Sequence, residues 1–419
     1  MLIEFSIANY LSFKDRVTLS MLASPNKELE DSNVFQYNNK LFVKSAVIYG
    51  ANASGKSNLL NAFQFMRRMV ISSAKDTQVN EKIDVMRYKL SAECDDKPSF
   101  LEISFAQDNT IYRYGFEVDE NEIHSEWLFS TSSTKEAQLF VRTKNQIVVN
   151  STHFKEGKGL DARTRNNALF LSVCAQFNGE VARKILQWFK RLKIFNYSTS
   201  KSSLSATIDL LKDAKNKNRI MELMSIADLG ISDIMGRKEE MTIEHLPKKM
   251  PALLKKMIIQ AEKTTLEIKT LHNKFDNQGK EVGKIEFDLG EESGGTAKLI
   301  MMAGMLIDVI ENGKILLIDE LDAQMHHLLS RALIRMFNSS ANQSNAQLIC
   351  STHDTTLLQN SLFRRDQIWF TEKDKYGSSE LYSLIEIKGV RKENSFGKDY
   401  LQGKYGAIPF VGDLSCYFE

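Results

Sequence analysis

The sequence is poor in the features that staple a chain or anchor it in a membrane. Its four cysteines, Cys94, Cys174, Cys350 and Cys416, have no metal-ligand spacing. Scattered thiols of this kind are typical of a reducing compartment, so we expect a cytoplasmic protein without disulfides. No run of about 18 apolar residues is present, which argues against a membrane-spanning helix. The first residues also lack the basic and apolar regions of a signal peptide.

Strong net charge and rigid linkers are missing as well. The 55 Lys and Arg residues nearly balance the 53 Asp and Glu residues, which leaves a formal net charge of +2. Any nucleic-acid site would therefore have to be a local basic patch. Five prolines in 419 residues leave little room for rigid linkers, and there is no internal repeat. A hydrophobic content of 42% is that of a globular protein with one large core or two smaller ones.

The most informative stretch is the glycine-rich loop Gly50–Ser57, which reads GANASGKS. It lies between an apolar run at 46–49 and a helical pattern, and its spacing is that of a phosphate-binding loop. Lys56 would reach the β- and γ-phosphates, and Ser57 would ligate Mg²⁺. The alternative is a chance match in a loop rich in glycine and serine. The predicted nucleotide contacts of this stretch are Gly50, Asn52, Ala53, Ser54, Gly55, Lys56, Ser57 and Asn58.

Two later strands also end in polar residues. The apolar run 315–318 leads into Asp319 and Glu320, and the run 347–351 leads toward His353. Open α/β sheets bind ligands at the carboxyl ends of their strands. We therefore expect Asp319 to hold Mg²⁺ through water, and Glu320 to orient or deprotonate an attacking water. His353 would bond the γ-phosphate and that water. The alternatives are solvated acids and a structural histidine.

A second anion-binding turn lies at 292–296, where Ser293, Gly294 and Gly295 precede a helical pattern. A helix N-terminus with glycines before it presents several backbone N–H groups to an anion. One chain hardly needs two such turns for one nucleotide. The natural solution is a homodimer in which the second turn closes over the γ-phosphate held by the partner.

The hydrophobic periodicity predicts an α/β protein with a P-loop parallel sheet, an antiparallel β lobe and a helical insertion. Expected single elements are a strand over 2–8, a loop over 24–40, a helix over 56–72 and another over 181–195. Strands at 100–105, 110–116, 122–130, 137–142 and 146–149 form an antiparallel meander. We expect four parts: an ATPase lobe over 1–165, a mainly helical insertion over 166–262, a second ATPase lobe over 263–390, and a tail over 391–419.

Together these motifs resemble the head of ABC-type ATPases of the SMC/RecF/OLD group. Gly50–Ser57 resembles the Walker A loop, and 315–320 resembles the Walker B strand. The segment 292–296 resembles the ABC signature, Asp322 lies where a D-loop is expected, and His353 matches the switch histidine. The signature reads Glu-Ser-Gly-Gly-Thr instead of Leu-Ser-Gly-Gly-Gln. That variant, with YLQGKYGAIP at 400–409, is similar to stand-alone ATPases of phage defence and abortive infection, AbiL-like and AriA-like.

The resemblance implies an ATP- and Mg²⁺-dependent ATPase that dimerises head to head and turns over slowly. It also implies a sensor or scaffold with a separately encoded nuclease or toxin, because only 66 residues follow His353 (419 minus 353). The first alternative is a RecF-like DNA-binding ATPase of repair or recombination, with nucleic acid as partner. The second is a non-hydrolysing interaction module, against which Glu320 and His353 argue.

The remaining features each allow two interpretations. Basic residues beside Trp188 and Phe189 indicate either a nucleic-acid patch or, as we favour, a solvated helix face. Tyr10 or Phe13 could stack on the nucleobase, and Gln78 is a candidate Q-loop glutamine. Asp322, His326 and His327 could suggest a metal site, although a D-loop and helix start fits better. The other basic positions are Arg183, Lys184, Lys190, Arg191, Lys193, Lys248, Lys249, Lys255, Lys256, Lys388, Arg391, Lys392, Lys398 and Lys404. Aromatic residues read as sheet core are Tyr112, Tyr114, Phe116 and Trp127.

Overall fold

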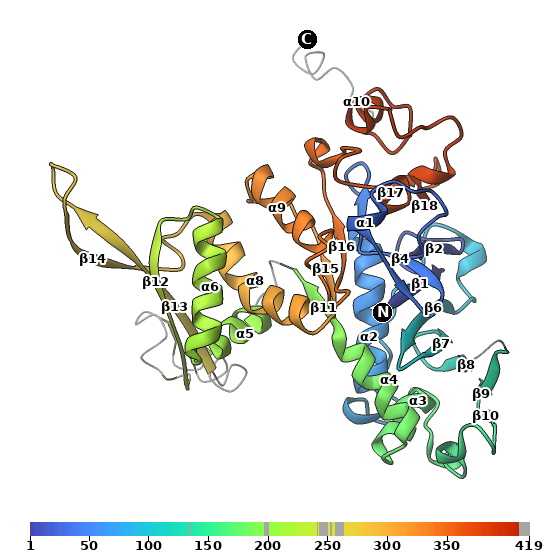
Figure 1. Ribbon diagram of the computed structural model, residues 1–419. Helices are drawn as coiled ribbons and strands as arrows, with labels where there is room; N and C mark the ends of the chain where they lie inside the picture. Colours follow the sequence, from blue (N-terminus) through green and yellow to red (C-terminus); the bar gives the residue numbers. More distant parts are fainter. Residues whose placement is uncertain are drawn as a thin grey trace. The chain divides into compact units, whose positions relative to one another are not determined.

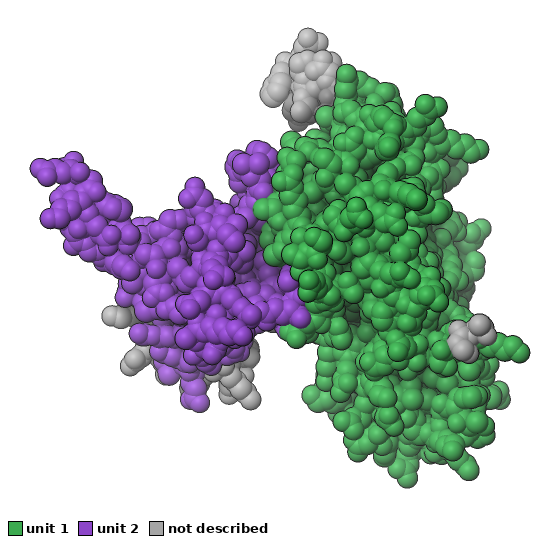
Figure 2. Space-filling model, viewed as in Figure 1, with its two compact units in different colours: residues 1–194, 312–321, 331–419 green, residues 195–311, 322–330 purple. Residues whose placement is uncertain are grey.

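The computed structural model describes residues 1–132, 135–196, 201–240 and 264–409, together with residues 242, 250, 251, 254 and 255 (Figure 1). The chain forms two compact units (Figure 2). Unit 1 comprises residues 1–194, 312–321 and 331–419, and unit 2 comprises residues 195–311 and 322–330. Helix α9 (His327–Phe337) begins in unit 2 and continues into unit 1.

A six-stranded sheet in unit 1 carries the predicted motifs. Its strand order is β11-β15-β16-β5-β17-β18. Strands β15, β16, β5 and β17 run parallel, and β18 returns antiparallel to β17. The first three are buried along their whole length, as in parallel sheets covered on both faces. The predicted parallel sheet is therefore confirmed. The strands are β5 (Ser45–Tyr49), β11 (Leu192–Phe195), β15 (Ile315–Ile318), β16 (Gln347–Ser351), β17 (Ile368–Lys373) and β18 (Ser379–Ser383).

The predicted meander is also present, as a seven-stranded antiparallel sheet in the order β10-β9-β8-β7-β6-β1-β2. Asp108 and Asn109 form a two-residue turn between β6 and β7, with φ angles of 48° and 62° that suit a tight hairpin. The N-terminal strand β1 pairs with β6 and so extends the meander. The strands are β1 (Leu2–Ala8), β2 (Val17–Ser20), β6 (Ser99–Gln107), β7 (Thr110–Val118), β8 (Ile123–Thr131), β9 (Ala137–Thr143) and β10 (Gln146–Val149).

Helix α2 (Lys56–Asp76) follows the glycine-rich loop and packs its apolar face into the core of unit 1. The ring of Phe63 stacks on that of Phe5, with 3.7 Å between centroids. The remaining helices of unit 1 are α1 (Glu30–Asn33), α3 (Phe170–Gln176), α4 (Glu180–Arg191) and α10 (Phe396–Leu401). Short 3-10 turns occupy Ala92–Cys94, Lys155–Gly157, Asp161–Arg163, Thr355–Leu357, Arg365–Gln367 and Leu384–Glu386.

Two sequence predictions about single elements were wrong, and a region expected to be mainly helical also contains a strand. The helix expected over 181–195 ends at Arg191, because 192–195 joins the parallel sheet as β11. The stretch 24–40 contains α1 and a hairpin of β3 (Val34–Tyr37) and β4 (Lys40–Val43) instead of a loop. Within the expected helical insertion, 231–240 is a strand. For 192–195 and 231–240, pairing with a distant segment overrides the local pattern, whereas β3 and β4 pair with each other across a two-residue turn.

Unit 2 packs three helices beside an antiparallel sheet with the order β12-β13-β14 (Figure 1). Gly304 lets α8 approach α5 closely, since a Cβ there would lie 2.6 Å from the backbone of Thr207. The elements are α5 (Lys201–Leu211), α6 (Ala214–Ile226), α8 (Gly294–Glu311), β12 (Ile231–Glu240), β13 (Thr264–Phe275) and β14 (Glu281–Asp288). The stretch 253–261, which has a helical pattern of apolar residues in the sequence, falls largely outside the described residues, as do Lys248, Lys249 and Lys256.

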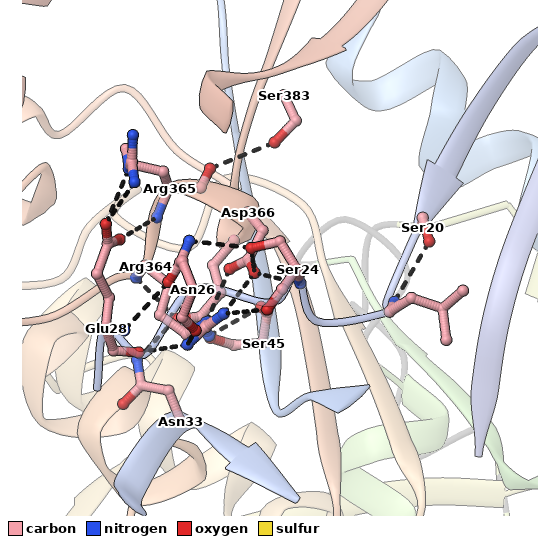
Figure 3. A network of polar contacts seen from close by, with 12 residues as sticks. Ser20, Ser24, Asn26, Glu28, Asn33, Ser45, Arg364, Arg365, Asp366 and Ser383 are labelled. Carbon is pink, nitrogen blue, oxygen red and sulfur yellow. Dashed lines mark hydrogen bonds and ion pairs between the residues drawn. The ribbon is translucent and has the colours of Figure 1, made fainter. Parts of the chain in front are cut away.

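A buried polar network ties the segment 24–28 to the start of β17 (Figure 3). The guanidinium of Arg364 is fully buried and donates to both carboxylate oxygens of Asp366, at 2.9 and 2.7 Å. It also donates to the main-chain oxygens of Ser24 and Asn26, at 3.1 and 3.0 Å. Asp366 in turn accepts the backbone N–H and the hydroxyl of Ser24. Every charged atom of the pair is thereby satisfied.

Two predicted absences can be compared with the structure. The cysteines Cys94, Cys174 and Cys350 are buried free thiols, while Cys416 lies outside the described residues. In the part of the chain that the structure describes, no helix has both the length and the apolar character needed to cross a membrane.

Candidate functional site

The three motifs of unit 1 meet at one edge of the parallel sheet. Ile318 of β15 pairs with Cys350 of β16, and Ser351 of β16 pairs with Ile48 of β5. Because these strands are parallel and in register, their carboxyl ends lie side by side. The glycine-rich loop, the two carboxylates and the histidine segment all emerge there, which is where an open α/β sheet binds its ligands.

The glycines at both ends of the loop are required by its conformation. Gly55 has a φ of +120°, and a Cβ at this position would lie 2.6 Å from the hydroxyl oxygen of Ser379. A Cβ at Gly50 would lie 2.3 Å from the main-chain oxygen of Thr371. Ala53 between them has a φ of 60°. Gly50 and Gly55 therefore pack against β17 and β18 with no room for a side chain.

Hydroxyl groups from three separate segments fix the outside of the loop. The hydroxyl oxygens of Ser54 and Thr371 lie 2.7 Å apart, and the Ser379 hydroxyl donates to the main-chain oxygen of Ser54 at 2.6 Å. The side-chain amide of Asn58 donates to Ser12 Oγ at 2.8 Å. The side chains of Ser54 and Asn58 therefore help to hold the loop in its conformation. Sequence reasoning missed Ser12, Thr371 and Ser379, because the loop motif carries no signal for them.

The lysine of the loop lies inside its curve. Lys56 Nζ donates to the main-chain oxygens of Gly50 and Ala51, each at 2.9 Å, and the residue is only 6% exposed. The first i→i−4 bond of helix α2 runs from Leu59 to Gly55, so the N–H groups of Ser57 and Asn58 precede intrahelical bonding. A charged donor and a helix N-terminus thus face the same space, which suits phosphate.

Asp319 and Glu320 are held by a single hydroxyl. Ser351 Oγ donates to Asp319 Oδ1 at 2.6 Å and accepts the backbone N–H of Glu320 at 2.7 Å. Glu320 adopts a left-handed φ of 50°, and its residue is exposed. Asp319 is therefore held against β16, and Glu320 follows it at an exposed turn position. The sequence motif contained Ser351 but carried no sign of this role.

The residues present suit Mg²⁺ carried in with a nucleotide. Neither the Ser57 hydroxyl nor Asp319 Oδ2 makes a hydrogen bond within the described part of the chain. Hydroxyl and carboxylate oxygens are ligands that Mg²⁺ prefers, usually one or two from the protein beside phosphate oxygens. Among the described residues no group of three His, Cys, Asp or Glu side chains could hold a metal. The alternative metal site at Asp322, His326 and His327 is therefore not supported.

A cavity of about 390 Å³ opens at the start of the loop. His353 lines it together with Gly50 and Asn52, so the structure brings together the predicted switch histidine and Walker A loop. The C-terminal segment supplies another part of its wall. The lining residues are Gly50, Ala51, Asn52, His353, Thr355, Tyr400, Leu401, Ile408 and Pro409.

The C-terminal wall is anchored by two residues. Tyr400 stacks on Phe370, with ring centroids 5.5 Å apart, and its hydroxyl donates to the main-chain oxygen of Ala407 at 3.0 Å. Asp399 accepts Lys404 Nζ at 2.5 Å and the Tyr405 hydroxyl at 3.3 Å. The hydrogen bond from Lys404 lowers the pKa of the Asp399 carboxyl. The stretch 400–409 was noted in the sequence only for its family resemblance.

Two sequence proposals for the nucleotide site are not supported. Tyr10 and Phe13 are both buried, and the Tyr10 ring packs against Phe65 with 5.6 Å between centroids. Burial also raises the pKa of Tyr10. Neither ring presents a face to a nucleobase. Gln78, the candidate Q-loop glutamine, is exposed two residues beyond the end of α2 and does not line the cavity.

The signature segment lies in unit 2, at the N-terminus of α8. Ser293 is exposed, and its hydroxyl oxygen accepts the backbone N–H of Thr296 at 3.1 Å, as an N-cap does. A Cβ on Gly295 would lie 2.6 Å from the main-chain oxygen of Gln324, and one on Gly294 would lie 2.9 Å from its side-chain oxygen. Asp322 belongs to the same unit, and its main-chain oxygen accepts the N–H of Met325 at 3.0 Å.

The structure of helix α4 agrees with the interpretation of its basic residues as a solvated helix face. Trp188 and Phe189 are buried, and Trp188 stacks on Phe105 with 4.0 Å between centroids. Arg191 donates to the main-chain oxygens of Asn312 and Gly313, at 2.9 and 2.8 Å. The sheet aromatics Tyr112, Tyr114 and Phe116 are buried as predicted, whereas Trp127 is half-buried.

These features define an α/β protein with a P-loop-type glycine-rich loop at the edge of a parallel sheet, an antiparallel sheet in the same unit, and a second unit in which a serine-glycine turn precedes α8. The chain belongs to the family described as "AAA domain, putative AbiEii toxin, Type IV TA system", which matches residues 45–359. The match begins at β5 and extends past His353. Among curated proteins, none matches the chain.

Solved structures similar to this chain include two SMC heads and RecF. The SMC head domain from Thermotoga maritima is 13% identical, with 91% of this chain and 98% of that one covered and a TM-score of 0.40. The Smc head with an extended coiled coil, from Pyrococcus furiosus, is 12% identical, covering 91% and 96%, with a TM-score of 0.37. The recombination mediator RecF with ATP is 14% identical, covering 84% and 93%, with a TM-score of 0.30.

Proposed function

We propose that this protein binds ATP with Mg²⁺ at Gly50–Ser57 and hydrolyses it slowly. One observation carries the proposal: the loop, the acidic pair Asp319 and Glu320, and His353 all emerge at the same edge of one parallel sheet. Each group has the chemistry that phosphoryl transfer to water requires, which is positioning and charge stabilisation. A non-hydrolysing module would not need Glu320 and His353 beside an intact phosphate loop.

Each residue has a defined part in this proposal. Lys56 turns from the loop carbonyls toward the β- and γ-phosphate oxygens. Glu320 orients a water molecule and accepts its proton while the oxygen attacks the γ-phosphorus and the bond to ADP breaks. His353 donates a hydrogen bond to the γ-phosphate. Ser57, and Asp319 through water, would hold Mg²⁺, which would supply positive charge beside the phosphates.

We further propose that two copies close head to head on ATP. Ser293 and the two glycines after it form an exposed helix N-terminus, a second anion site that one nucleotide in one chain does not need. In the dimer this turn would cap the γ-phosphate bound by the other copy, and Asp322 would lie in the D-loop. Hydrolysis would remove the shared phosphate and loosen the pair.

For the biological role we propose the sensor or scaffold subunit of an anti-phage, abortive-infection system with a separate nuclease or toxin. The family's description, which names a toxin and a toxin–antitoxin system, supports this role. The alternative is a RecF-like DNA-binding ATPase, for which the exposed Arg183 and Lys190 of α4 would supply backbone contacts. Neither residue has an ion pair within the described residues.

The solution mass of Glu320→Gln with and without Mg-ATP tests the proposal. Removing the carboxylate leaves the phosphate loop intact, so we expect ATP to double the mass, and Lys56→Ala to stay monomeric in ATP. Hydrolysis by Glu320→Gln at the wild-type rate would contradict its assignment. A protein that co-purifies from the native host would support the defence role, whereas salt-sensitive, ATP-dependent DNA binding would support the alternative.

A further inference from the structure

The residue before the signature serine has an unusual environment. Glu292 has a side chain only 7% exposed, although Ser293 beside it is exposed. Its Oε1 accepts two hydrogen bonds from strand β13, one from the Thr270 hydroxyl and one from His272 Nε2 at 2.7 Å. Most carboxylates at a surface turn remain in water, whereas the carboxylate of Glu292 is held by donors from the protein.

The chemistry of the contact defines its donors. An ionised carboxylate only accepts, so His272 carries its hydrogen on Nε2 and Thr270 donates its hydroxyl. Thr270 is fully buried, and the ring of His272 packs on Phe287 with 4.8 Å between centroids. The two donors are two positions apart on one strand, hence on one face of the sheet. The strand therefore presents a preformed carboxylate clamp.

The other side of the signature is held as well. Lys298, in the second turn of α8, is 1% exposed and donates from Nζ to the main-chain oxygen of Ala323 at 2.9 Å. Gly294 and Gly295 pack directly against Gln324. The signature is thus fixed between β13, through Glu292, and the segment 323–324. All of these residues belong to unit 2.

We propose that Thr270 and His272 are positioning residues for the signature, and that they work by drawing the charge of Glu292 away from the phosphate-binding turn. A carboxylate rotated toward Ser293 would compete for the same N–H groups and repel an incoming γ-phosphate. Bound to β13, it leaves the N-terminus of α8 open to an anion. This inference rests on the proposed ATP-driven dimer.

The test compares two double variants in the Glu320→Gln background. Thr270→Val with His272→Phe keeps shape and ring packing but removes both donors. Thr270→Ser with His272→Gln retains a hydroxyl and an N–H donor and serves as the matched control. We expect the first pair to weaken ATP-driven dimerisation about tenfold, equivalent to about 1.4 kcal/mol. The control pair should dimerise within about twofold of the parent, and a fluorescent ATP analogue should bind monomers of all three equally.

Replacing Glu292 by glutamine removes its charge, and so shows whether the clamp acts on that charge or only supports the fold. If the clamp sequesters charge, adding Glu292→Gln to the Val/Phe variant restores dimerisation. If the clamp only supports the fold, that addition restores nothing, which would overturn the inference. Normal dimerisation of the Val/Phe variant would overturn it too. The variant Ser293→Arg tests the proposed dimer separately from the proposed clamp. If this variant still dimerises on ATP, the proposed dimer itself is wrong.

Discussion

The hydroxyl of Ser351 donates to Oδ1 of Asp319 across 2.6 Å, while its oxygen accepts the backbone N–H of Glu320 at 2.7 Å. One side chain from β16 thus orients both acids that follow β15. The two strands are parallel neighbours, so the geometry of this contact comes directly from the sheet. The buried serine therefore connects the sheet to the proposed hydrolytic residues.

Replacing Ser351 by alanine should slow hydrolysis more than it weakens ATP binding. The change removes the hydrogen bond to Asp319 and the acceptor for Glu320, which corresponds to about 1–3 kcal/mol and a rate loss of about tenfold or more. Steady-state turnover measures the effect on hydrolysis, and the affinity for a fluorescent ATP analogue measures the effect on ATP binding. Ser383→Ala, another buried strand serine that donates only to main-chain oxygens, is the matched control. Unchanged turnover in Ser351→Ala would contradict the assignment.

Gly55→Ala should abolish nucleotide binding. The new Cβ would meet the Ser379 hydroxyl at 2.6 Å and the Ser12 hydroxyl at 3.0 Å, in addition to the strain of φ +120°. Gly279→Ala is the matched control, because Gly279 has a φ of +78° and a Cβ added there would meet nothing within 4 Å. The control should lose about 1–2 kcal/mol of stability from backbone strain and keep its nucleotide affinity. Tight ATP binding by Gly55→Ala would show that the loop can rearrange.

Asp399→Asn should loosen the C-terminal wall of the cavity. The lowered pKa of Asp399 means that its contribution to stability is complete above its ordinary value of 3.8 and is lost as pH falls through the lowered pKa. The wild-type anchor should therefore be insensitive to pH between about 5 and 9. Hydrogen exchange of amides 396–408 should rise in Asp399→Asn at neutral pH. Glu393→Gln, an exposed acid nearby, is the control, and equal exchange in both variants would contradict the anchoring role.

Arg364→Met should destabilise the fold without a direct effect on the site. It leaves the carboxylate of Asp366 buried without its partner, which typically costs about 3–5 kcal/mol. Arg68→Met removes a solvent-exposed pair with Asp84 and should cost less than about 1 kcal/mol. Urea unfolding measures both. Adding Asp366→Asn to Arg364→Met should recover part of the loss, because no uncompensated charge then remains buried. A cost for Arg364→Met as small as that for Arg68→Met would contradict the network's structural role.

Much of the fold was predictable where the signal is local. The Gly50–Ser57 loop can be recognised from a short run of adjacent residues, and α2 after it shows a regular apolar face. The meander strands alternate with period two, and Asp108 with Asn109 marks a tight turn. The buried runs at 315–318 and 347–351 were recognisable as parallel strands because they carry no polar face.

Errors came where a distant partner decides the local structure. The segment 192–195 continues an amphipathic helix in sequence, yet it becomes the strand next to β15. The segment 231–240 reads as part of a helical region, yet it pairs along its length with β13. Tyr10 looked available for a nucleobase until packing against Phe65 buried it. No window of neighbouring residues contains these partners.

The sequence by itself determined which chemistry is present: a phosphate loop with Lys56 and Ser57, two acids after a buried strand, a histidine after the next, and a serine-glycine turn before a helix. Their identity follows from residue type and spacing. Only the tertiary structure decided what holds them in place: Ser351 between the acids, Thr371 and Ser379 around the loop, the 400–409 wall, and the clamp on Glu292. Those contacts join residues far apart in the chain, so they form and contribute to stability only once the sheets have formed.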